Sequence, residues 1–213
     1  MSTTDDAPAP AAPASGIADP APLGLAAFAL TTFLLSGANA GWMTHATGNA
    51  WLGYAFAYGG LCQLLAGMWE FRNRNVFGAT AFSTYGGFWI GLGLWVLLVA
   101  NHAPPAGVSA AAYGAETGKD LGWILLAFAI FNTYMLIIST QVNMAVFLVF
   151  LTLEATEVIL FAGFFANNTT LHKAGGYVGV LTALVAWYTS SAGVMNGHKG
   201  RVVFPVGKPL FGL

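Results

Sequence analysis

Two carboxyl side chains stand in the middle of a long apolar stretch of this sequence. Glu154 and Glu157 lie near the midpoint of Met144–Ala166, three residues apart, so a helix would place them on one face. An ionised carboxylate at the centre of a bilayer costs at least about 2.5 kcal/mol on insertion scales, and no Lys or Arg lies within any apolar stretch to pair with it. At least one of the two should therefore be protonated at neutral pH, beside neutral groups or water. The pair indicates either a proton-coupling site on a transport path or a hydrogen-bonded structural contact.

Neutral polar and aromatic side chains recur on the other apolar stretches. Those of the first stretch fall at helical spacing, so they would share one face of a helix. Such a face suits a narrow amphipathic pore, although it would also suit an ordinary interface between helices. The candidates to line a pore on the first three stretches are Phe28, Thr32, Asn39, Gln63, Thr84 and Tyr85.

Several other chemistries lack their residues. None of the four histidines lies near the middle of an apolar stretch, and the only cysteine, Cys62, leaves no disulfide or cysteine metal site within the chain. The patterns of membrane proteases and P-loop ATPases are missing. The formal net charge of -1 offers no basic patch for nucleic acid. We therefore expect a protein that is not an enzyme, with no catalytic residues, cofactor or metal site.

The amino-acid composition indicates which class of protein holds these side chains in place. Of 213 residues, 57% are hydrophobic and only 7% are charged, whereas an ordinary soluble domain carries roughly 25% charged residues. A hydrocarbon core about 30 Å thick needs roughly 20 mostly apolar residues per helix. We therefore expect an all-α polytopic membrane protein with six transmembrane helices. Their expected ranges are Leu23–Ala40, Ala50–Trp69, Thr80–Ala100, Leu121–Thr140, Met144–Ala166 and Ala174–Met195.

The distribution of basic residues predicts the orientation of these helices. Arg72, Arg74, Lys199, Arg201 and Lys208 would all lie on the same side as the N-terminus. The positive-inside rule places that side in the cytoplasm. Residues 1–18, rich in Ala and Pro, are expected to be a disordered cytoplasmic tail. The membrane domain then spans residues 19–199, followed by a cytoplasmic C-terminal tail at 200–213.

Small residues recur every four positions on two of the expected helices. They are Ala79, Ser83, Gly87 and Gly91 on one, and Gly175, Gly179 and Ala183 on the other. Helices in lipid pack closely through such residues, so we expect both stripes in tight contacts within the bundle or between subunits.

Several motifs resemble a known family. Asp19–Leu25 (DPAPLGL) looks like the signature Asn-Pro-Ala-Pro-Leu-Gly-Leu of the acetate uptake transporter family, the succinate–acetate permeases. Further matches are Tyr58–Gln63, Ala66–Glu70, Phe77–Trp89 and Gly200–Gly207, in the order and spacing of the family. The resemblance implies six helices per protomer, a homo-hexamer with a pore in each protomer, and movement of acetate, in some members also succinate, either proton-coupled or channel-like.

The family resemblance also implies an aromatic–tyrosine–leucine constriction, at positions that match Phe28, Tyr85 and Leu151 here. Asn39 matches an asparagine of the family. Two features depart from the family: Asp19 replaces the signature asparagine, and Glu154 and Glu157 stand where many bacterial members have apolar residues.

The resulting hypothesis is an inner-membrane (plasma-membrane) transporter for acetate and similar short carboxylates. Neutral donors would replace part of the carboxylate hydration in the pore. Because no basic residue lies at depth, a proton should travel with the anion, or the neutral acid should cross. The alternatives are a channel for ammonia or another small neutral solute, and a membrane subunit that assembles without transporting anything. Besides substrate and protons, the expected partners are the lipid bilayer and further copies of the chain.

Overall fold

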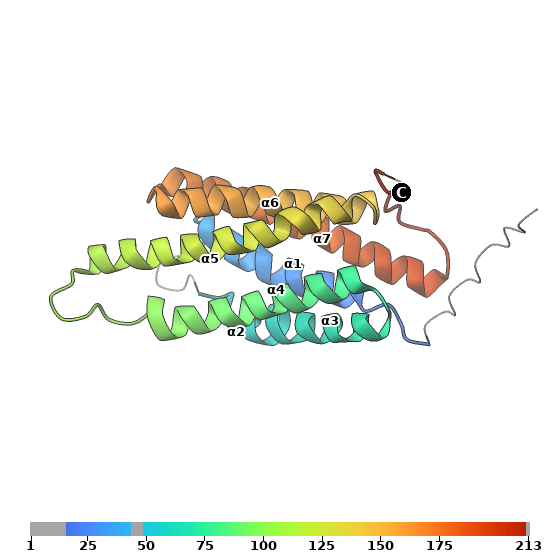
Figure 1. The fold of residues 1–213 in the computed structure, drawn as a ribbon, viewed down its shortest axis with the longest axis horizontal. Coiled ribbons are helices and arrows are strands. Elements are labelled where there is room, and N and C mark those ends of the chain that lie inside the picture. Colours follow the sequence, from blue (N-terminus) through green and yellow to red (C-terminus); the bar gives the residue numbers. More distant parts are fainter. Residues whose placement is uncertain (1–15, 44–48, 212–213) are drawn as a thin grey trace, which may run out of the picture.

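The computed structural model describes residues 16–43 and 49–211, and every regular element among them is helical (Figure 1). The all-α class is therefore confirmed. Most of the expected tail at 1–18, the last two residues of the chain and His45 lie outside the described residues. The helices are α1 (Ala21–Asn39), α2 (Leu52–Phe56), α3 (Gln63–Arg72), α4 (Val76–Trp95), α5 (Ala110–Ser139), α6 (Met144–Phe165) and α7 (Thr169–Lys199).

Within the described part of the chain, five helices are long and apolar enough to cross a membrane: α1, α4 with its continuation to Ala100, α5, α6 and α7. The expected second span is not one regular helix. It consists of α2, a π-helical segment at Ala57–Cys62, and α3. A second π-helical segment, Val96–Ala100, continues α4. The expected second span at Ala50–Trp69 is therefore a continuous helical run, Leu52 to Arg72, with a π-helical middle, and it is not among the five helices that are long and apolar enough to cross a membrane.

Two adjacent glycines of the π-helical segment between α2 and α3 allow neighbouring helices to approach it closely. A Cβ atom on Gly59 would lie 2.8 Å from Cβ of Thr31, and one on Gly60 would lie 2.6 Å from Cγ1 of Ile90. Neighbouring helices thus approach the backbone of this segment on two sides. A wider turn in the helix is a local rearrangement that apolar periodicity in the sequence does not reveal.

Side-chain caps fix where most helices begin. Asn75, Ser109, Asn143 and Asn168 each accept a hydrogen bond from a backbone N–H in the first turn of the following helix. Gly200 ends α7 in the left-handed conformation, with a φ of 60°. α5 begins eleven residues before the expected Leu121, because the cap at Ser109 starts it outside the apolar stretch.

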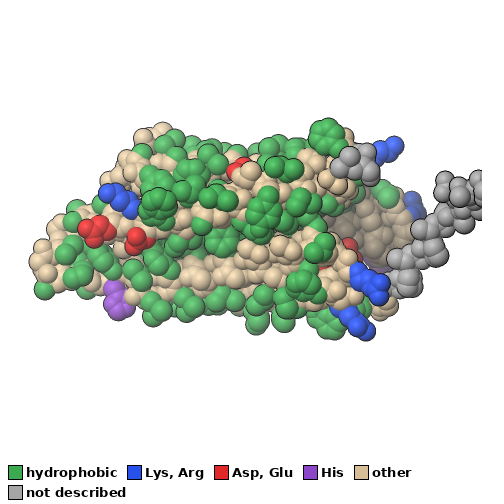
Figure 2. All heavy atoms as spheres, in the orientation of Figure 1, with side chains coloured by type: hydrophobic (Ala, Val, Ile, Leu, Met, Phe, Trp, Pro, Cys, Tyr) green, Lys and Arg blue, Asp and Glu red, His purple; other side chains and the backbone are tan. Residues whose placement is uncertain are grey.

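The helices form one elongated bundle, with the start of α1 and the end of α7 at the same end (Figure 1). α1 packs against α7 on one side and against α3 and the π-helical segment on another. In the space-filling view, Lys and Arg gather at the two ends and an apolar surface lies between them (Figure 2). This distribution is the one expected of a protein that spans a bilayer.

The small-residue stripe on α7 lies in tight contacts, as expected. Ala183 is fully buried, and a Cβ on Gly175 would lie 2.6 Å from Leu160. Between them, Gly179 contacts Ser36 of α1. The stripe on α4 divides: Ala79 is buried, but no atom of the described chain lies within 4 Å of a Cβ on Gly87 or Gly91.

Candidate functional site

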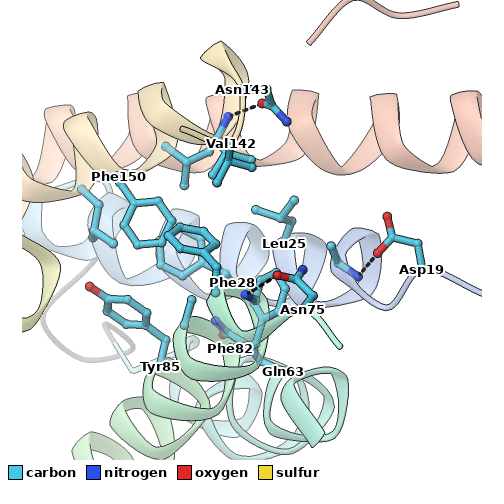
Figure 3. Close-up of a pocket in the computed structure, with 17 residues that line it drawn as sticks. Asp19, Leu25, Phe28, Gln63, Asn75, Phe82, Tyr85, Val142, Asn143 and Phe150 are labelled. Atoms are coloured by element: carbon cyan, nitrogen blue, oxygen red, sulfur yellow. Dashed lines mark hydrogen bonds between the residues drawn. The ribbon is translucent and has the colours of Figure 1, made fainter. Parts of the chain in front are cut away.

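A cavity of about 220 Å³ enters the bundle at the end where α1 begins (Figure 3). It lies among α1, α3, α4 and α6, and aromatic and aliphatic side chains form most of its wall. Its lining residues are Asp19, Ala21, Leu25, Phe28, Gln63, Asn75, Phe77, Gly78, Ala81, Phe82, Tyr85, Val142, Asn143, Val146, Val149, Phe150 and Leu153.

Three helix N-termini meet at the mouth of this cavity. Asp19 Oδ1 accepts a hydrogen bond from Ala21 N at 2.9 Å, Asn75 Oδ1 accepts one from Gly78 N at 3.1 Å, and Asn143 Oδ1 accepts one from Val146 N at 2.9 Å. Each helix N-terminus carries a partial positive charge. The mouth therefore combines three positive dipole ends, two neutral amides and one carboxyl group.

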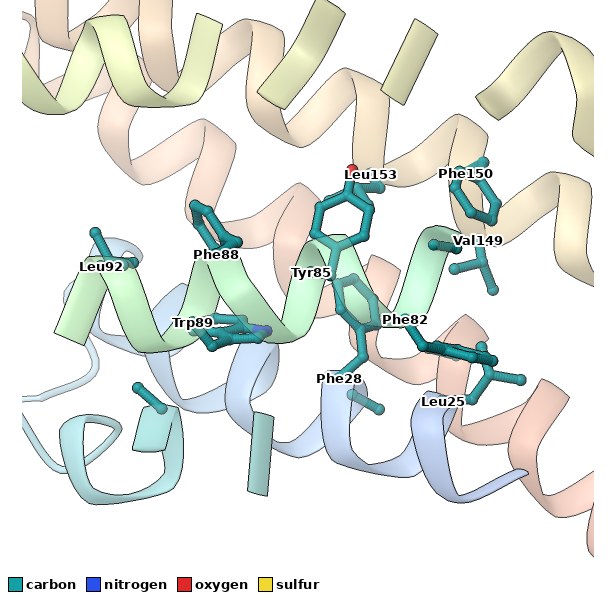
Figure 4. Close-up of a cluster of buried hydrophobic side chains, with 14 of the residues drawn as sticks. Leu25, Phe28, Phe82, Tyr85, Phe88, Trp89, Leu92, Val149, Phe150 and Leu153 are labelled. Carbon is teal, nitrogen blue, oxygen red and sulfur yellow. The ribbon is translucent and has the colours of Figure 1, made fainter. Parts of the chain in front are cut away.

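Two aromatic rings close the inner end of the cavity. The centroids of the Phe28 and Tyr85 rings are 5.9 Å apart in an edge-to-face arrangement (Figure 4). The Tyr85 ring also packs on Phe128 and Phe131 of α5, with centroid separations of 6.0 and 5.5 Å. The structure thus brings together the two aromatic residues that the sequence singled out for a constriction.

Leu151 does not join this pair. Its side chain is 42% exposed and does not line the cavity, whereas the Leu153 side chain is 7% exposed and does. Two residues along an α-helix correspond to a rotation of about 200° around its axis, so the two side chains point to nearly opposite faces. Leu151 therefore lies on the face of α6 that points away from the cavity.

The remaining pore candidates are distributed along the bundle. Gln63 lines the cavity and is 1% exposed, and its Oε1 has no hydrogen-bond partner among the described residues. Thr32 is buried one turn beyond Phe28 on α1, and its Oγ1 likewise has no partner there. Asn39 and Thr84 are partly buried and do not line the cavity.

The two carboxyl groups on α6 belong to a buried hydrogen-bond network behind the constriction. Glu157 is 4% exposed, and its Oε1 lies 3.3 Å from the Tyr85 hydroxyl. Glu154 accepts a hydrogen bond from Asn132 Nδ2 at 2.7 Å and contacts Thr133 Oγ1 at 2.9 Å. These neighbours are the neutral groups that the sequence led us to expect. Neither carboxyl group lines the cavity itself.

Asn132 of α5 is the central residue of this network, and the sequence did not single it out as a site residue. Its Oδ1 accepts from the Tyr85 hydroxyl at 3.0 Å, and its Nδ2 donates to Phe150 O and to Glu154. The available signal was an amide at the middle of an apolar stretch, which needs partners when buried. Its partners lie on two other helices, so the sequence could not name them.

The bundle of apolar helices encloses a cavity that reaches the Phe28–Tyr85 pair, an arrangement that suits a membrane transport protein. No three His, Cys, Asp or Glu side chains in the described part of the chain come together as a metal site. The family model of the GPR1/FUN34/yaaH family matches residues 3–208. The chain belongs to this family, which comprises transporters and channels, and it is therefore not an enzyme.

Similar proteins carry names that refer to small solutes. "Acetate permease A" of Emericella nidulans is 41% identical over 202 residues, which cover 89% of this chain and 65% of the permease. "Ammonia transport outward protein 2" of Saccharomyces cerevisiae is 38% identical over 194 residues, with coverages of 90% and 67%. "Succinate-acetate/proton symporter SatP" of Escherichia coli K12 is 32% identical over 192 residues, with coverages of 90% and 96%. The chain thus spans about two thirds of the length of the fungal relatives.

A solved structure has the same fold. "Structure of the bacterial acetate channel SatP" superposes with a TM-score of 0.80 at 31% identity, and covers 90% of this chain and 99% of that one. The all-α bundle of this chain is therefore similar to that of the bacterial channel.

The carboxyl group of Asp19 should reduce the entry of anions at the cavity mouth. We expect Asp19→Asn to raise the entry of a small anion such as acetate about two- to threefold at low ionic strength, because it removes a negative charge and keeps an oxygen that caps α1. The difference should shrink between about 0.01 M and about 1 M salt, as screening shortens the reach of the charge. The matched control is Asp120→Asn, at an exposed position at the other end of the bundle. It should leave the uptake rate unchanged at both low and high salt.

Proposed function

We propose that this protein moves acetate, similar short carboxylates and the larger succinate across the inner (plasma) membrane. The observation that carries the proposal is the cavity that leads from three helix N-termini to the Phe28–Tyr85 pair. The family supports it, because relatives of 32–41% identity are named for acetate or succinate transport.

The mouth of the cavity suits a carboxylate. Its helix N-termini attract a negative charge without a basic side chain. Deeper in the cavity, the amide of Gln63 offers hydrogen bonds in place of water, and Thr32 offers a hydroxyl beyond the rings. Asn39 and Thr84 do not line the cavity, and we keep them only as candidate donors elsewhere on the pathway.

The constriction favours small solutes that carry no net charge. Phe28 and Tyr85 form two of its sides, and we assign the third side to Leu153 rather than to Leu151. With no basic residue at this depth, a bare anion would lose hydration without compensation. A proton therefore crosses with the anion, or the neutral acid crosses.

Assembly and topology complete the proposal. The three pieces Leu52–Phe56, Ala57–Cys62 and Gln63–Arg72 together act as a sixth membrane-spanning segment. The termini and the basic residues near them lie in the cytoplasm by the positive-inside rule. Six protomers assemble, each with its own pore, as the resemblance of the sequence motifs implies.

A leucine pair on α6 tests the assignment of the constriction. We expect Leu153→Ala to raise uptake of butyrate relative to acetate, because it removes apolar volume from the cavity wall. A group of about one methylene is worth roughly 1–3 kcal/mol in a tight apolar site. Leu151→Ala should keep the wild-type ratio, since that side chain is outside the cavity. If Leu151→Ala raises the ratio of butyrate to acetate uptake and Leu153→Ala does not, Leu151 and not Leu153 forms the constriction.

Ammonia is the second candidate substrate, because one relative is named for ammonia export. Acetate and ammonia can be distinguished by measuring the transport of each in cells that lack their own acetate uptake and express this chain. We expect them to accumulate labelled acetate and to lose this ability with Gln63→Leu. Export of ammonia with no gain in acetate uptake would favour the second candidate.

A further inference from the structure

We propose that Glu157 is protonated at neutral pH and, together with Asn132, positions the Tyr85 hydroxyl at the constriction, so that loss of the Glu157 proton lowers carboxylate transport. The proposal deepens the proposed function and rests on it for its transport consequence. It assigns Asn132 and Glu157 as positioning residues, since neither contacts the cavity directly.

The orientation of the Asn132 amide is fixed by its surroundings. Its Nδ2 lies 3.0 Å from Phe150 O and 2.7 Å from Glu154 Oε2, and a carbonyl oxygen can only accept. The nitrogen must therefore face these two oxygens, and Asn132 Oδ1 must face the Tyr85 hydroxyl. Asn132 is fully buried, so this oxygen has no access to solvent.

The Tyr85 hydroxyl has one proton and two oxygen neighbours. It lies 3.0 Å from Asn132 Oδ1, which can only accept, and 3.3 Å from Glu157 Oε1. If Glu157 were ionised, both neighbours would compete for the single hydroxyl proton. If Glu157 is protonated, it donates to Tyr85 and Tyr85 donates to Asn132, so that every contact is a hydrogen bond.

The second oxygen of Glu157 leads to the same assignment. Glu157 Oε2 is buried and has no hydrogen-bond partner among the described residues. An ionised carboxylate with at most one shared donor would be costly in this apolar surrounding. The carbonyl oxygen of a neutral acid costs far less to leave unpaired, because it carries no net charge.

Glu154, unlike Glu157, has neutral donors beside both of its oxygens. It is partly exposed, accepts a short hydrogen bond from Asn132 Nδ2, and contacts the Thr133 hydroxyl. Two carboxyl groups in one network repel each other when both are ionised. A proton on Glu157 therefore removes this repulsion and satisfies the contacts of the network.

Few other titratable groups face this network. The titratable side chains on the middle parts of the helices around Glu157 are Glu154 on α6, Tyr85 on α4, Tyr134 on α5, and Tyr177 and Tyr188 on α7. The last three are between 44% and 56% exposed, and α1 carries no titratable side chain. No basic group from these segments is available to stabilise a charge on Glu157.

Loss of the Glu157 proton would change the constriction in two ways. It would place a negative charge in contact with the hydroxyl of Tyr85, whose ring lines the cavity, and so repel a carboxylate. It would also draw the hydroxyl proton away from Asn132, because hydrogen bonds to a charged acceptor are stronger. Transport should therefore fall as pH rises through the deprotonation of Glu157.

Acetate exchange in liposomes tests this consequence. With equal pH on both sides, from about pH 5 to about pH 9, the rate of Glu157→Gln divided by the wild-type rate cancels the titration of acetate itself. We expect this ratio to rise several-fold with pH, because the amide stays neutral. Glu154→Gln is the matched control: it keeps Glu157 and should still decline with pH, but at lower pH, because the repulsion from Glu154 is gone. A constant ratio for Glu157→Gln would overturn the pH consequence.

Infrared difference spectroscopy of the purified protein tests the protonation itself. A protonated carboxyl group has a C=O stretch that an ionised carboxylate lacks. We expect this band in wild type at neutral pH, its loss in Glu157→Gln, and its retention at altered frequency in Asn132→Leu. A wild-type spectrum without the band would overturn the proposal. This readout needs no transport, so it distinguishes failure of the proton assignment from failure of acetate as the substrate.

Discussion

Tyr85→Ala should give the largest change in substrate selection. We expect liposomes with this variant to take up butyrate and other larger carboxylates at least about tenfold faster relative to acetate than wild type does, because the ring no longer narrows the path. The Tyr85 ring contacts Phe28, Phe88 and Phe128, so its removal opens space on every side of the constriction. Relative uptake rates of a series of labelled acids measure the effect.

Tyr85→Phe is the matched control for this variant. It keeps the ring and removes only the hydroxyl that contacts Asn132 and Glu157. The size preference should therefore stay near that of wild type. If Tyr85→Ala is folded and keeps the wild-type preference for acetate, the ring does not set the size limit. Because large-to-small changes at aromatic core positions destabilise by about 3–5 kcal/mol, folding is checked by size-exclusion chromatography.

Gly176→Leu should give the largest change in stability. A Cβ at this position would contact the backbone of α1, 2.8 Å from Asn39 C and 2.8 Å from Ser36 O. Backbone atoms cannot move aside as a flexible side chain can, so α1 and α7 would have to separate. Overpacking of this kind costs about 1–3 kcal/mol or more, and we expect a severe loss of folded protein from the membrane.

Gly87→Leu is the control for Gly176→Leu, because it makes the same substitution at a glycine without close neighbours among the described residues. The described chain has no atom within 4 Å of a Cβ at Gly87, so the single protomer should accommodate the side chain. We expect folded protein in normal amounts, with an altered oligomer size if copies of the chain meet at this face. Equal yields of Gly87→Leu and Gly176→Leu would show that these contacts do not determine stability.

Much of the fold could be predicted because apolar length and helix caps are local properties. The first and fifth spans were expected within two residues of α1 and α6, and Asn143 marks the start of α6 in the sequence itself. The π-helical segment was not predicted, because apolar periodicity does not reveal a wider turn, and the approach of Thr31 and Ile90 to Gly59 and Gly60 involves other helices. The early start of α5 was missed because its first turns are not apolar.

Part of the candidate site could also be predicted, because helical spacing along one helix is a local property. Phe28, Gln63 and Tyr85 do line one cavity. Leu151 lies outside the cavity while Leu153 lines it, because a shift of two residues along a helix reverses the face. The link between Glu157 and Asn132 passes through the Tyr85 hydroxyl, and contacts among three helices do not appear in the spacing along any one of them.

Flux of labelled acetate into liposomes that hold only the purified wild-type protein tests the central claim most directly. We predict uptake well above that of protein-free liposomes, faster when the outside is acidic, and reduced by Gln63→Leu, which removes the amide from the cavity. Acetate uptake equal to that of protein-free liposomes at every pH, from protein that is folded by size-exclusion chromatography, would contradict the account.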